Sequence, residues 1–121
     1  MRNIWDTRLM HYMDPKYRED VLELYKDCHD YSPYVELDEI MAFVTECFIE
    51  RNKDLSHPRT IGQVKMKWGY LTIYYDGGPE PFLDEIVRMA ENLSIDISKD
   101  VWARHRKRGS KNQPVLHPIE N

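Results

Sequence analysis

The sequence lacks long apolar runs and has few cysteines, and both absences exclude classes of protein. Its uninterrupted apolar stretches are only a few residues long, whereas a transmembrane helix needs about 20 such residues. Residues 1–6 lack the apolar core of a secretory signal. The two cysteines, Cys28 and Cys47, lie on apparent helical faces, which indicates buried free thiols and no disulfide framework. We therefore expect a cytoplasmic protein without a membrane partner.

A recognisable catalytic or metal-binding motif is also missing. No motif combines a nucleophile with a base and an orienting group, and Asp76-Gly77-Gly78 lacks the lysine of a phosphate-binding loop. The triplet Cys28-His29-Asp30 is not expected to form a metal site, because adjacent residues on a helix point about 100° apart and a site would need Cys47 and a further histidine from elsewhere. The other histidines show no ligand spacing. We expect no catalytic residue, no metal and no cofactor, although an active site assembled across the fold stays open.

The charge is distributed unevenly along the 121 residues, a length typical of one domain. Residues 1–98 carry 11 lysines and arginines against 19 acids, whereas residues 99–121 carry 6 against 2. An acidic body should repel nucleic acid, and a basic tail should attract it. The sequence predicts a compact domain of residues 1–98 and a basic, partly disordered extension of residues 99–121.

A β-hairpin is predicted for the stretch Gln63-Val-Lys-Met-Lys-Trp-Gly-Tyr-Leu-Thr-Ile-Tyr-Tyr75, with its turn at Gly69-Tyr70. Because side chains alternate along a strand, this turn collects the apolar residues on one face. A slip of one residue would set apolar side chains opposite polar ones. The apolar pairs are Trp68 with Leu71, Met66 with Ile73, and Val64 with Tyr75, and the polar-face pairs are Lys67 with Thr72 and Lys65 with Tyr74.

Three amphipathic helices are predicted around this hairpin. The first begins at Asp14-Pro15 and ends near Asp30, the second covers residues 37–52, and the third opens at Pro79 or Pro81. Since a hairpin cannot bury its apolar face alone, the expected fold is α+β. Two N-terminal helices, the central hairpin and a C-terminal helix then form two layers, followed by the basic tail. The predicted core comprises Val64, Met66, Trp68, Leu71, Ile73, Tyr75, Ile86, Met89, Leu93, Ile40 and Val44.

Two groups of side chains are candidates for binding. The polar face of the hairpin combines cations with aromatic rings, a combination that can stack bases and hold phosphates. A solvated face, on which lysine stems shield the tyrosine rings, explains the same pattern. The tail carries a basic cluster that suits nucleic acid or an acidic partner. Trp102 beside the cluster either packs on the body or anchors a partner. The candidate residues are Lys65, Lys67, Tyr70, Tyr74, Trp102, Arg104, Arg106, Lys107 and Arg108.

The hairpin motif, followed by Ile86-Val-Arg-Met-Ala-Glu91 and Ser94, resembles a group of small uncharacterised phage and prophage proteins. Those proteins carry a run close to Gln-Val-Lys-Glu-Lys-Phe-Gly-x-Leu-Arg-Phe-Tyr, and the match covers about residues 31–94. Many place a Cys-x-x-Cys pair after the Met-Ala-Glu helix, but here Ile95-Asp-Ile-Ser-Lys-Asp-Val-Trp102 contains no cysteine. The resemblance implies a viral or prophage origin and a compact α+β domain, without a metal site.

These observations together predict a non-catalytic phage-type accessory protein that binds and modulates or inhibits a host factor, either a host protein or a small ligand. A first alternative is a nucleic-acid-binding accessory protein that uses the tail and the lysine and tyrosine face, with weak affinity. A second alternative is a small hydrolase or nucleotide-binding enzyme with an unrecognised site. The oligomeric state, including a homodimer, stays open.

Overall fold

A three-stranded sheet lies at the centre of the protein. The computed structural model describes the backbone of residues 8–109 and the side chains of residues 9–105. Strands β2 (Thr60–Lys67) and β3 (Tyr70–Asp76) form the predicted hairpin. A short strand that the sequence did not predict, β1 (Asp30–Tyr31), lies parallel to β2, which is therefore the middle strand.

The register of the hairpin differs from the prediction because the turn lies one residue earlier in the sequence. The two turn residues are Trp68 and Gly69, with φ angles of 57° and 81°, and positive φ at both positions is the signature of a type I′ turn. Met66 consequently pairs with Leu71, and Val64 pairs with Ile73. The predicted turn at Gly69-Tyr70 is wrong, as are the cross-strand pairs derived from it. Both registers place the same strand residues on the same face, so the apolar pattern cannot distinguish them.

A β-bulge between Ile61 and Gln63 changes the phase of β2. Beyond it, Ile61 pairs with Tyr75, and Ile61 is fully buried like Val64. The Tyr75 ring meets the Phe48 ring edge-on, with 5.3 Å between the ring centroids. The bulge therefore keeps the whole length of β2 in contact with the core.

The N-terminal part begins with two short 3-10 helices, η2 (Arg8–Tyr12) and η3 (Pro15–Tyr17), and continues into α1 (Arg18–Leu24). The Asp14 carboxylate accepts a hydrogen bond of 3.0 Å from the Lys16 amide, which confirms the predicted cap. The predicted end of this helix near Asp30 is wrong, because the chain leaves the helix after Leu24 and enters β1.

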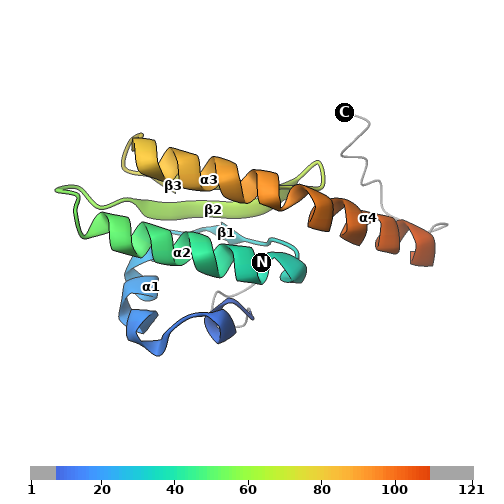
Figure 1. The fold of residues 1–121 in the computed structure, drawn as a ribbon, viewed down its shortest axis with the longest axis horizontal. Helices are drawn as coiled ribbons and strands as arrows, with labels where there is room; N and C mark the ends of the chain where they lie inside the picture. Colours follow the sequence, from blue (N-terminus) through green and yellow to red (C-terminus); the bar gives the residue numbers. More distant parts are fainter. Residues whose placement is uncertain (1–7, 110–121) are drawn as a thin grey trace.

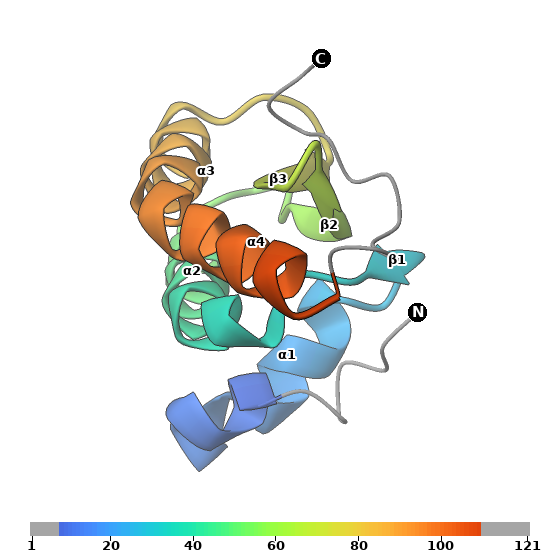
Figure 2. The same ribbon diagram turned by 90° about the vertical axis from the view of Figure 1, so that its right-hand side faces the viewer.

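Helices α2 (Asp38–Asn52) and α3 (Pro81–Leu93) form the second layer, as predicted. The 3-10 helix η4 (Val35–Leu37) leads into α2. The two helices lie side by side and antiparallel over one face of the sheet, and α1 packs beside α2 (Figures 1 and 2). Within residues 8–109, no helix covers the other face of the sheet (Figure 2). The fold is therefore an α+β arrangement of two layers with one open sheet face.

The core fills the space between the sheet and the helices. Fully buried side chains come from every layer, and they include Leu9, Val21, Leu37, Met41, Val44, Phe48, Ile61, Val64 and Leu83. On α3 the buried side is formed by Leu83, Ile86 and Ala90. Three predicted core residues are exposed instead: Trp68 by 54%, Met89 by 38% and Leu93 by 58%. The apolar arc of α3 is wider than its contact with the body, and spacing alone does not say which edge of the arc packs inward.

One residue, Glu80, joins the ends of α2, α3 and β3. Glu80 caps α3 by accepting hydrogen bonds of 3.2 Å each from the Phe82 and Leu83 amides. The same carboxylate binds the Arg51 guanidinium through two contacts of 3.0 and 3.2 Å. The Glu80 amide donates to the Tyr75 hydroxyl at 2.9 Å, at the end of β3. Glu80 is only 4% exposed. Its buried charge is stable because Arg51 and the α3 amides donate hydrogen bonds to the carboxylate.

Helix α4 (Ile95–Gly109) continues beyond the end of the sheet (Figure 1). It runs without interruption across the predicted domain boundary at residues 98 and 99. Val101 is 1% exposed and Trp102 is 9% exposed, so both pack on the body. The Tyr34 and His105 rings, 6.3 Å apart, also tie α4 to the chain before η4. We therefore expect truncation after Ser98 to destabilise the domain.

The different surroundings of two tryptophans give the first prediction. Trp102→Ala should lower the free energy of unfolding by about 3 kcal/mol, because it empties a buried site. Trp68→Ala removes the same side chain from an exposed turn and should change the free energy by less than about 1 kcal/mol. Urea denaturation of both variants measures the difference. Equal losses would contradict the packing of α4 described above.

The contacts of Glu80 give a second prediction, which concerns the pH dependence of stability. The hydrogen bond from Arg51, followed by those from the α3 amides, holds the pKa of Glu80 below its usual value. A lowered folded-state pKa stabilises the protein above the usual carboxyl pKa, and this contribution is lost as the pH falls through the lowered pKa. The stability difference between the wild type and Glu80→Gln, measured by urea denaturation, should thus be largest at neutral pH and should shrink towards acid. Glu85→Gln, which changes an exposed carboxylate on the same helix, is the control. A pH-independent difference for Glu80→Gln would refute the assignment.

Candidate binding surfaces

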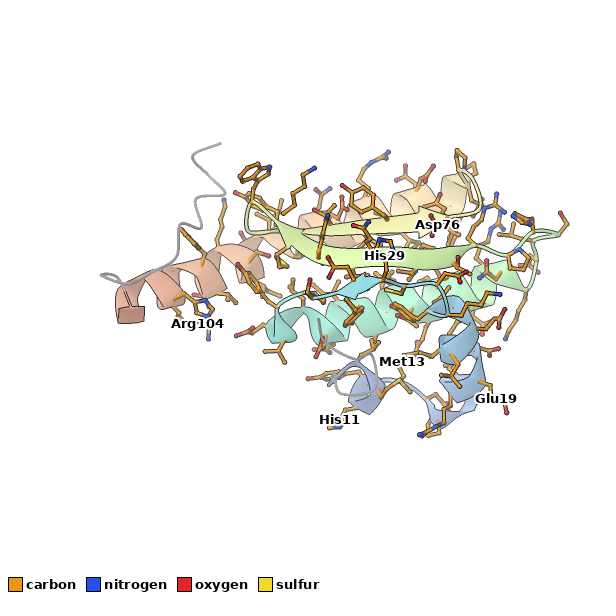
Figure 3. All side chains as sticks on the ribbon, turned by 180° about the vertical axis from the view of Figure 1, so that it is seen from behind. His11, Met13, Glu19, His29, Asp76 and Arg104 are labelled. Atoms are coloured by element: carbon orange, nitrogen blue, oxygen red, sulfur yellow. The ribbon has the colours of Figure 1, made fainter. Side chains whose placement is uncertain are left out.

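The open sheet face collects the hairpin residues predicted to bind. Lys65 pairs with Thr72, Lys67 pairs with Tyr70, and Gln63 pairs with Tyr74. Lys65, Lys67, Tyr70 and Tyr74 therefore share this face as predicted, although the predicted partners within it were wrong. The Lys65 ammonium lies 5.7 Å from the centroid of the Tyr74 ring, and Tyr74 is 43% exposed. This face, which is turned towards the viewer in Figure 3, therefore places one lysine ammonium beside an aromatic ring.

Trp68 lies in the turn at the tip of the hairpin, and sequence reasoning missed it as a binding residue. Its ring is 54% exposed, and its backbone has a φ of 57°. A left-handed backbone costs a residue other than glycine about 1–2 kcal/mol. Asparagine, which favours this conformation, would suit the turn better. The Trp-Gly dipeptide was the available signal, because glycine at the second turn position also permits the type I′ turn.

The two layers differ in charge. The three strands carry two lysines, Lys65 and Lys67, against two acids, Asp30 in β1 and Asp76 at the end of β3 far from the turn. Exposed acids instead gather on the helices, for example Glu19 and Asp20 on α1 and Glu39 and Glu50 on α2. The acidic body is thus acidic mainly on its helical side. Repulsion of a polyanion by the body is consequently weaker at the hairpin tip than the net charge implies.

The candidate residues of the tail separate into three groups. Trp102 is buried and so is not an exposed anchor. Arg104 is exposed, and its guanidinium lies 3.4 Å from both Glu36 and Asp100. The side chains of Arg106, Lys107 and Arg108 lie outside the described residues, although the backbone there continues α4. Helix α4 and the hairpin tip lie at the same end of the molecule (Figure 1).

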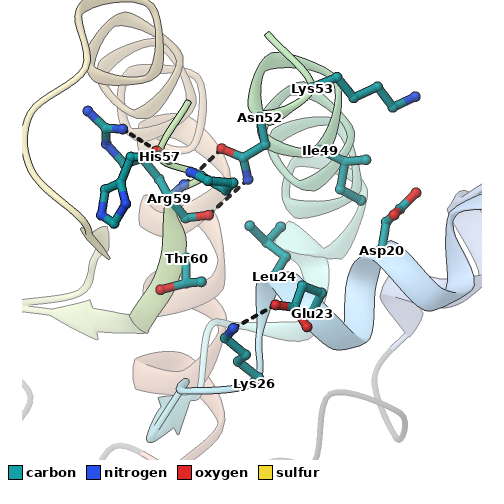
Figure 4. Close-up of a pocket in the computed structure, with 11 residues that line it drawn as sticks. Asp20, Glu23, Leu24, Lys26, Ile49, Asn52, Lys53, His57, Arg59 and Thr60 are labelled. Atoms are coloured by element: carbon teal, nitrogen blue, oxygen red, sulfur yellow. Dashed lines mark hydrogen bonds and ion pairs between the residues drawn. The ribbon is translucent and has the colours of Figure 1, made fainter. Parts of the chain in front are cut away.

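A hollow of about 440 Å³ lies between α1, the end of α2 and the following loop (Figure 4). The Asn52 side chain holds the Arg59 backbone through two hydrogen bonds of 2.9 Å. Arg59 donates to the carbonyl oxygens of Gly78 and Pro79, and Lys26 pairs with Glu23 at 2.6 Å. Lys26 and Arg59, which line the hollow, thus already have partners within the protein. The contacts of Asn52 and Arg59 fix the loop that follows α2.

The residues considered for metal binding or nucleophilic chemistry lie apart or in unsuitable surroundings. The Cys28 thiol donates to the Asp30 carbonyl oxygen at 3.6 Å, and the His29 ring contacts the Gln63 amide at 2.8 Å. Burial raises the pKa of both Cys28 and Cys47, which disfavours a reactive thiolate. In the part of the chain that the structure describes, no three histidine, cysteine or acidic residues are grouped to hold a metal ion.

Comparison of the chain with protein-family models, curated proteins and solved structures finds no match. The resemblance to phage and prophage proteins therefore stays a prediction. None of the helices in the described range combines the length and the apolar character that crossing a membrane requires.

Proposed function

We propose that this protein is a non-catalytic, cytoplasmic binding protein that holds single-stranded nucleic acid on its open sheet face, with Trp68 as the anchoring ring. The observation that carries this proposal is the position of Trp68, exposed in a left-handed turn. The left-handed backbone of Trp68 lowers the stability of the fold, and the exposed ring contributes little stability through burial. A binding role explains why a tryptophan stands where a smaller turn residue folds better.

The chemistry of the surrounding face suits a single strand. Trp68, Tyr70 and Tyr74 offer rings for stacking, which contributes about 1–3 kcal/mol per base and tolerates any sequence. Lys65 and Lys67 alternate with these rings and reach towards a phosphate backbone. A duplex hides the faces of its bases inside the stack, so the platform favours single strands over double strands.

The two edges of the sheet are poorly suited to pairing with a strand of a partner, which favours binding through the open face. The Glu91 carboxylate accepts a hydrogen bond of 3.1 Å from the Ile73 amide and so occupies one donor on the outer edge of β3. The opposite edge consists of β1, which is only two residues long. Addition of a strand from a partner is therefore disfavoured at both edges. Side chains on the open face remain as the means of recognition.

The salt dependence of binding distinguishes the hairpin from the tail. Contacts of Lys65 and Lys67 with two phosphates should give a log–log slope of about −1.4 on single strands. If Arg104, Arg106, Lys107, Arg108 and Lys111 also bind phosphates, the slope should approach about −5. The first value assigns binding to the sheet face alone, and the second adds the predicted role of the tail.

The function predicted from the resemblance, modulation or inhibition of a host factor, stays a prediction. A host protein or a small ligand as the target is compatible with an exposed tryptophan, since tryptophan is a frequent anchor at protein interfaces. The cation and ring alternation of the sheet face favours nucleic acid over these targets.

Replacement of Trp68 by asparagine tests the proposal. Trp68→Asn should leave the stability unchanged or increased, because Asn-Gly is a favoured type I′ turn. It should weaken binding to a labelled single-stranded oligonucleotide about fivefold to 150-fold, the equivalent of one lost stacking contact. Fluorescence anisotropy at low salt measures the affinity.

The matched control is Phe43→Asn, which removes an exposed ring from α2 on the opposite layer. This variant should bind the oligonucleotide like the wild type. If Trp68→Asn binds as tightly as the wild type, or if the wild type shows no binding at low salt, the sheet face is not a nucleic-acid platform.

A further inference from the structure

Large apolar side chains are exposed on the outer surface of the helical layer. On α3, Phe82, Met89 and Leu93 are 47%, 38% and 58% exposed. They are spaced at i, i+7 and i+11, so they form one stripe along the helix. On α2, Phe43 is 46% exposed. The sequence predicted Met89 and Leu93 for the core, and their exposure leaves this stripe uncovered within the described residues.

The two helices bring these side chains to one groove. The Arg51 guanidinium binds Glu80 and lies 5.6 Å from the centroid of the Phe82 ring, which fixes the end of α2 beside the start of α3. A hollow of about 450 Å³ there is lined by Phe43, Cys47 and Phe82. The two helices are antiparallel (Figure 1), and the spacing of i, i+7 and i+11 continues the apolar stripe from Phe82 to Met89 and Leu93 along α3.

The rim of this groove is acidic. On α2, Glu39, Phe43, Glu46 and Glu50 follow at i, i+4, i+7 and i+11, so carboxylates flank the exposed ring. Glu50 is engaged by Lys53 at 2.9 Å and by the Tyr17 hydroxyl at 2.8 Å. Within residues 9–105 no ion pair engages Glu46, whereas the charge of Asp54 acts on Arg51, which also binds Glu80. Apolar anchors and an excess of negative charge therefore meet in one place.

We propose that the α2–α3 groove is a docking surface for a basic amphipathic helix of a partner protein. Such a helix lays its apolar side chains, spaced at i, i+3 or i+4 and i+7, against Phe43, Phe82, Met89 and Leu93. Its lysines and arginines face Glu46 and Asp54, which supplies the charge complementarity. This surface lies on the opposite layer from the sheet face and does not depend on nucleic-acid binding.

Three other occupants fit this groove less well. A second copy in a symmetric dimer would oppose its own acidic rim, which costs free energy. The basic helix α4 of another copy cannot offer an apolar face, because Val101 and Trp102 are already buried. Nucleic acid is repelled by the carboxylates of the rim. A basic helix from a different protein is the occupant that satisfies both the apolar groove and its rim.

The test uses the full chain and a labelled 18-residue helical peptide of leucine and lysine, arranged so that one face is apolar. A scrambled peptide of the same composition and a leucine–glutamate peptide are the comparison probes. We expect the amphipathic basic peptide to bind more tightly than either comparison by about tenfold or more. Phe43→Ser should weaken binding of the basic peptide by a similar factor.

Further variants distinguish this surface from the sheet face and from a dimer. Glu46→Gln combined with Asp54→Asn should weaken peptide binding and reduce its salt dependence, whereas Trp68→Asn should leave it unchanged. Equal binding of the scrambled peptide, or unchanged binding by Phe43→Ser, would overturn the proposal. A wild-type dimer in light scattering that becomes monomeric in Phe43→Ser would assign the groove to a second copy instead. Oligonucleotide binding by Phe43→Ser reports separately on the function proposed for the sheet face.

Discussion

The ionic contact between Arg51 and Glu80 is the interaction on which the arrangement of the two layers depends. Glu80 is almost completely buried, and it is stable there as a charge because Arg51 and the first amides of α3 surround it. The same residue meets the end of β3 through the Tyr75 hydroxyl. The contact thus fixes where α3 begins relative to α2 and the hairpin, and it holds both helices on one face of the sheet.

One-sided coverage of the sheet explains why the molecule has two chemically different surfaces. Val64 and Ile73 point towards the helices, so the alternate residues Lys65, Thr72 and Tyr74 point away from them. The helices carry most of the exposed acids on their outer side. A net charge of −4 therefore combines an acidic helical surface with a sheet whose strands carry two lysines and two acids. Electrostatic arguments about partners must be made for each surface separately.

Strongly periodic sequence patterns predicted the helices and the hairpin. Features that a period does not constrain, such as the turn position and the rotation of α3, were missed. The hairpin, α2 and the α+β class followed from alternation and helical spacing. The turn was misplaced because a shift of two residues keeps every side chain on its face, so only the turn conformation at Trp68 and Gly69 decides. The rotation of α3 was missed because its apolar residues cover more than one face. Strand β1 is too short to show a period, and its pairing depends on contacts distant in sequence.

The binding residues were predictable only where they share an alternating face. Lys65 and Tyr74 were found in this way, whereas Trp68 and Phe43 were not, because a large apolar side chain in a periodic pattern is ordinarily assigned to the core. What identifies them is the difference between pattern and burial, because each is a large apolar side chain that is nevertheless exposed. Since Glu91 occupies the Ile73 amide on the edge of β3 and β1 is short, strand pairing with a partner is disfavoured at both edges. Recognition by this protein must then rest on side chains, and the exposed rings on its two layers are the largest apolar groups available for it.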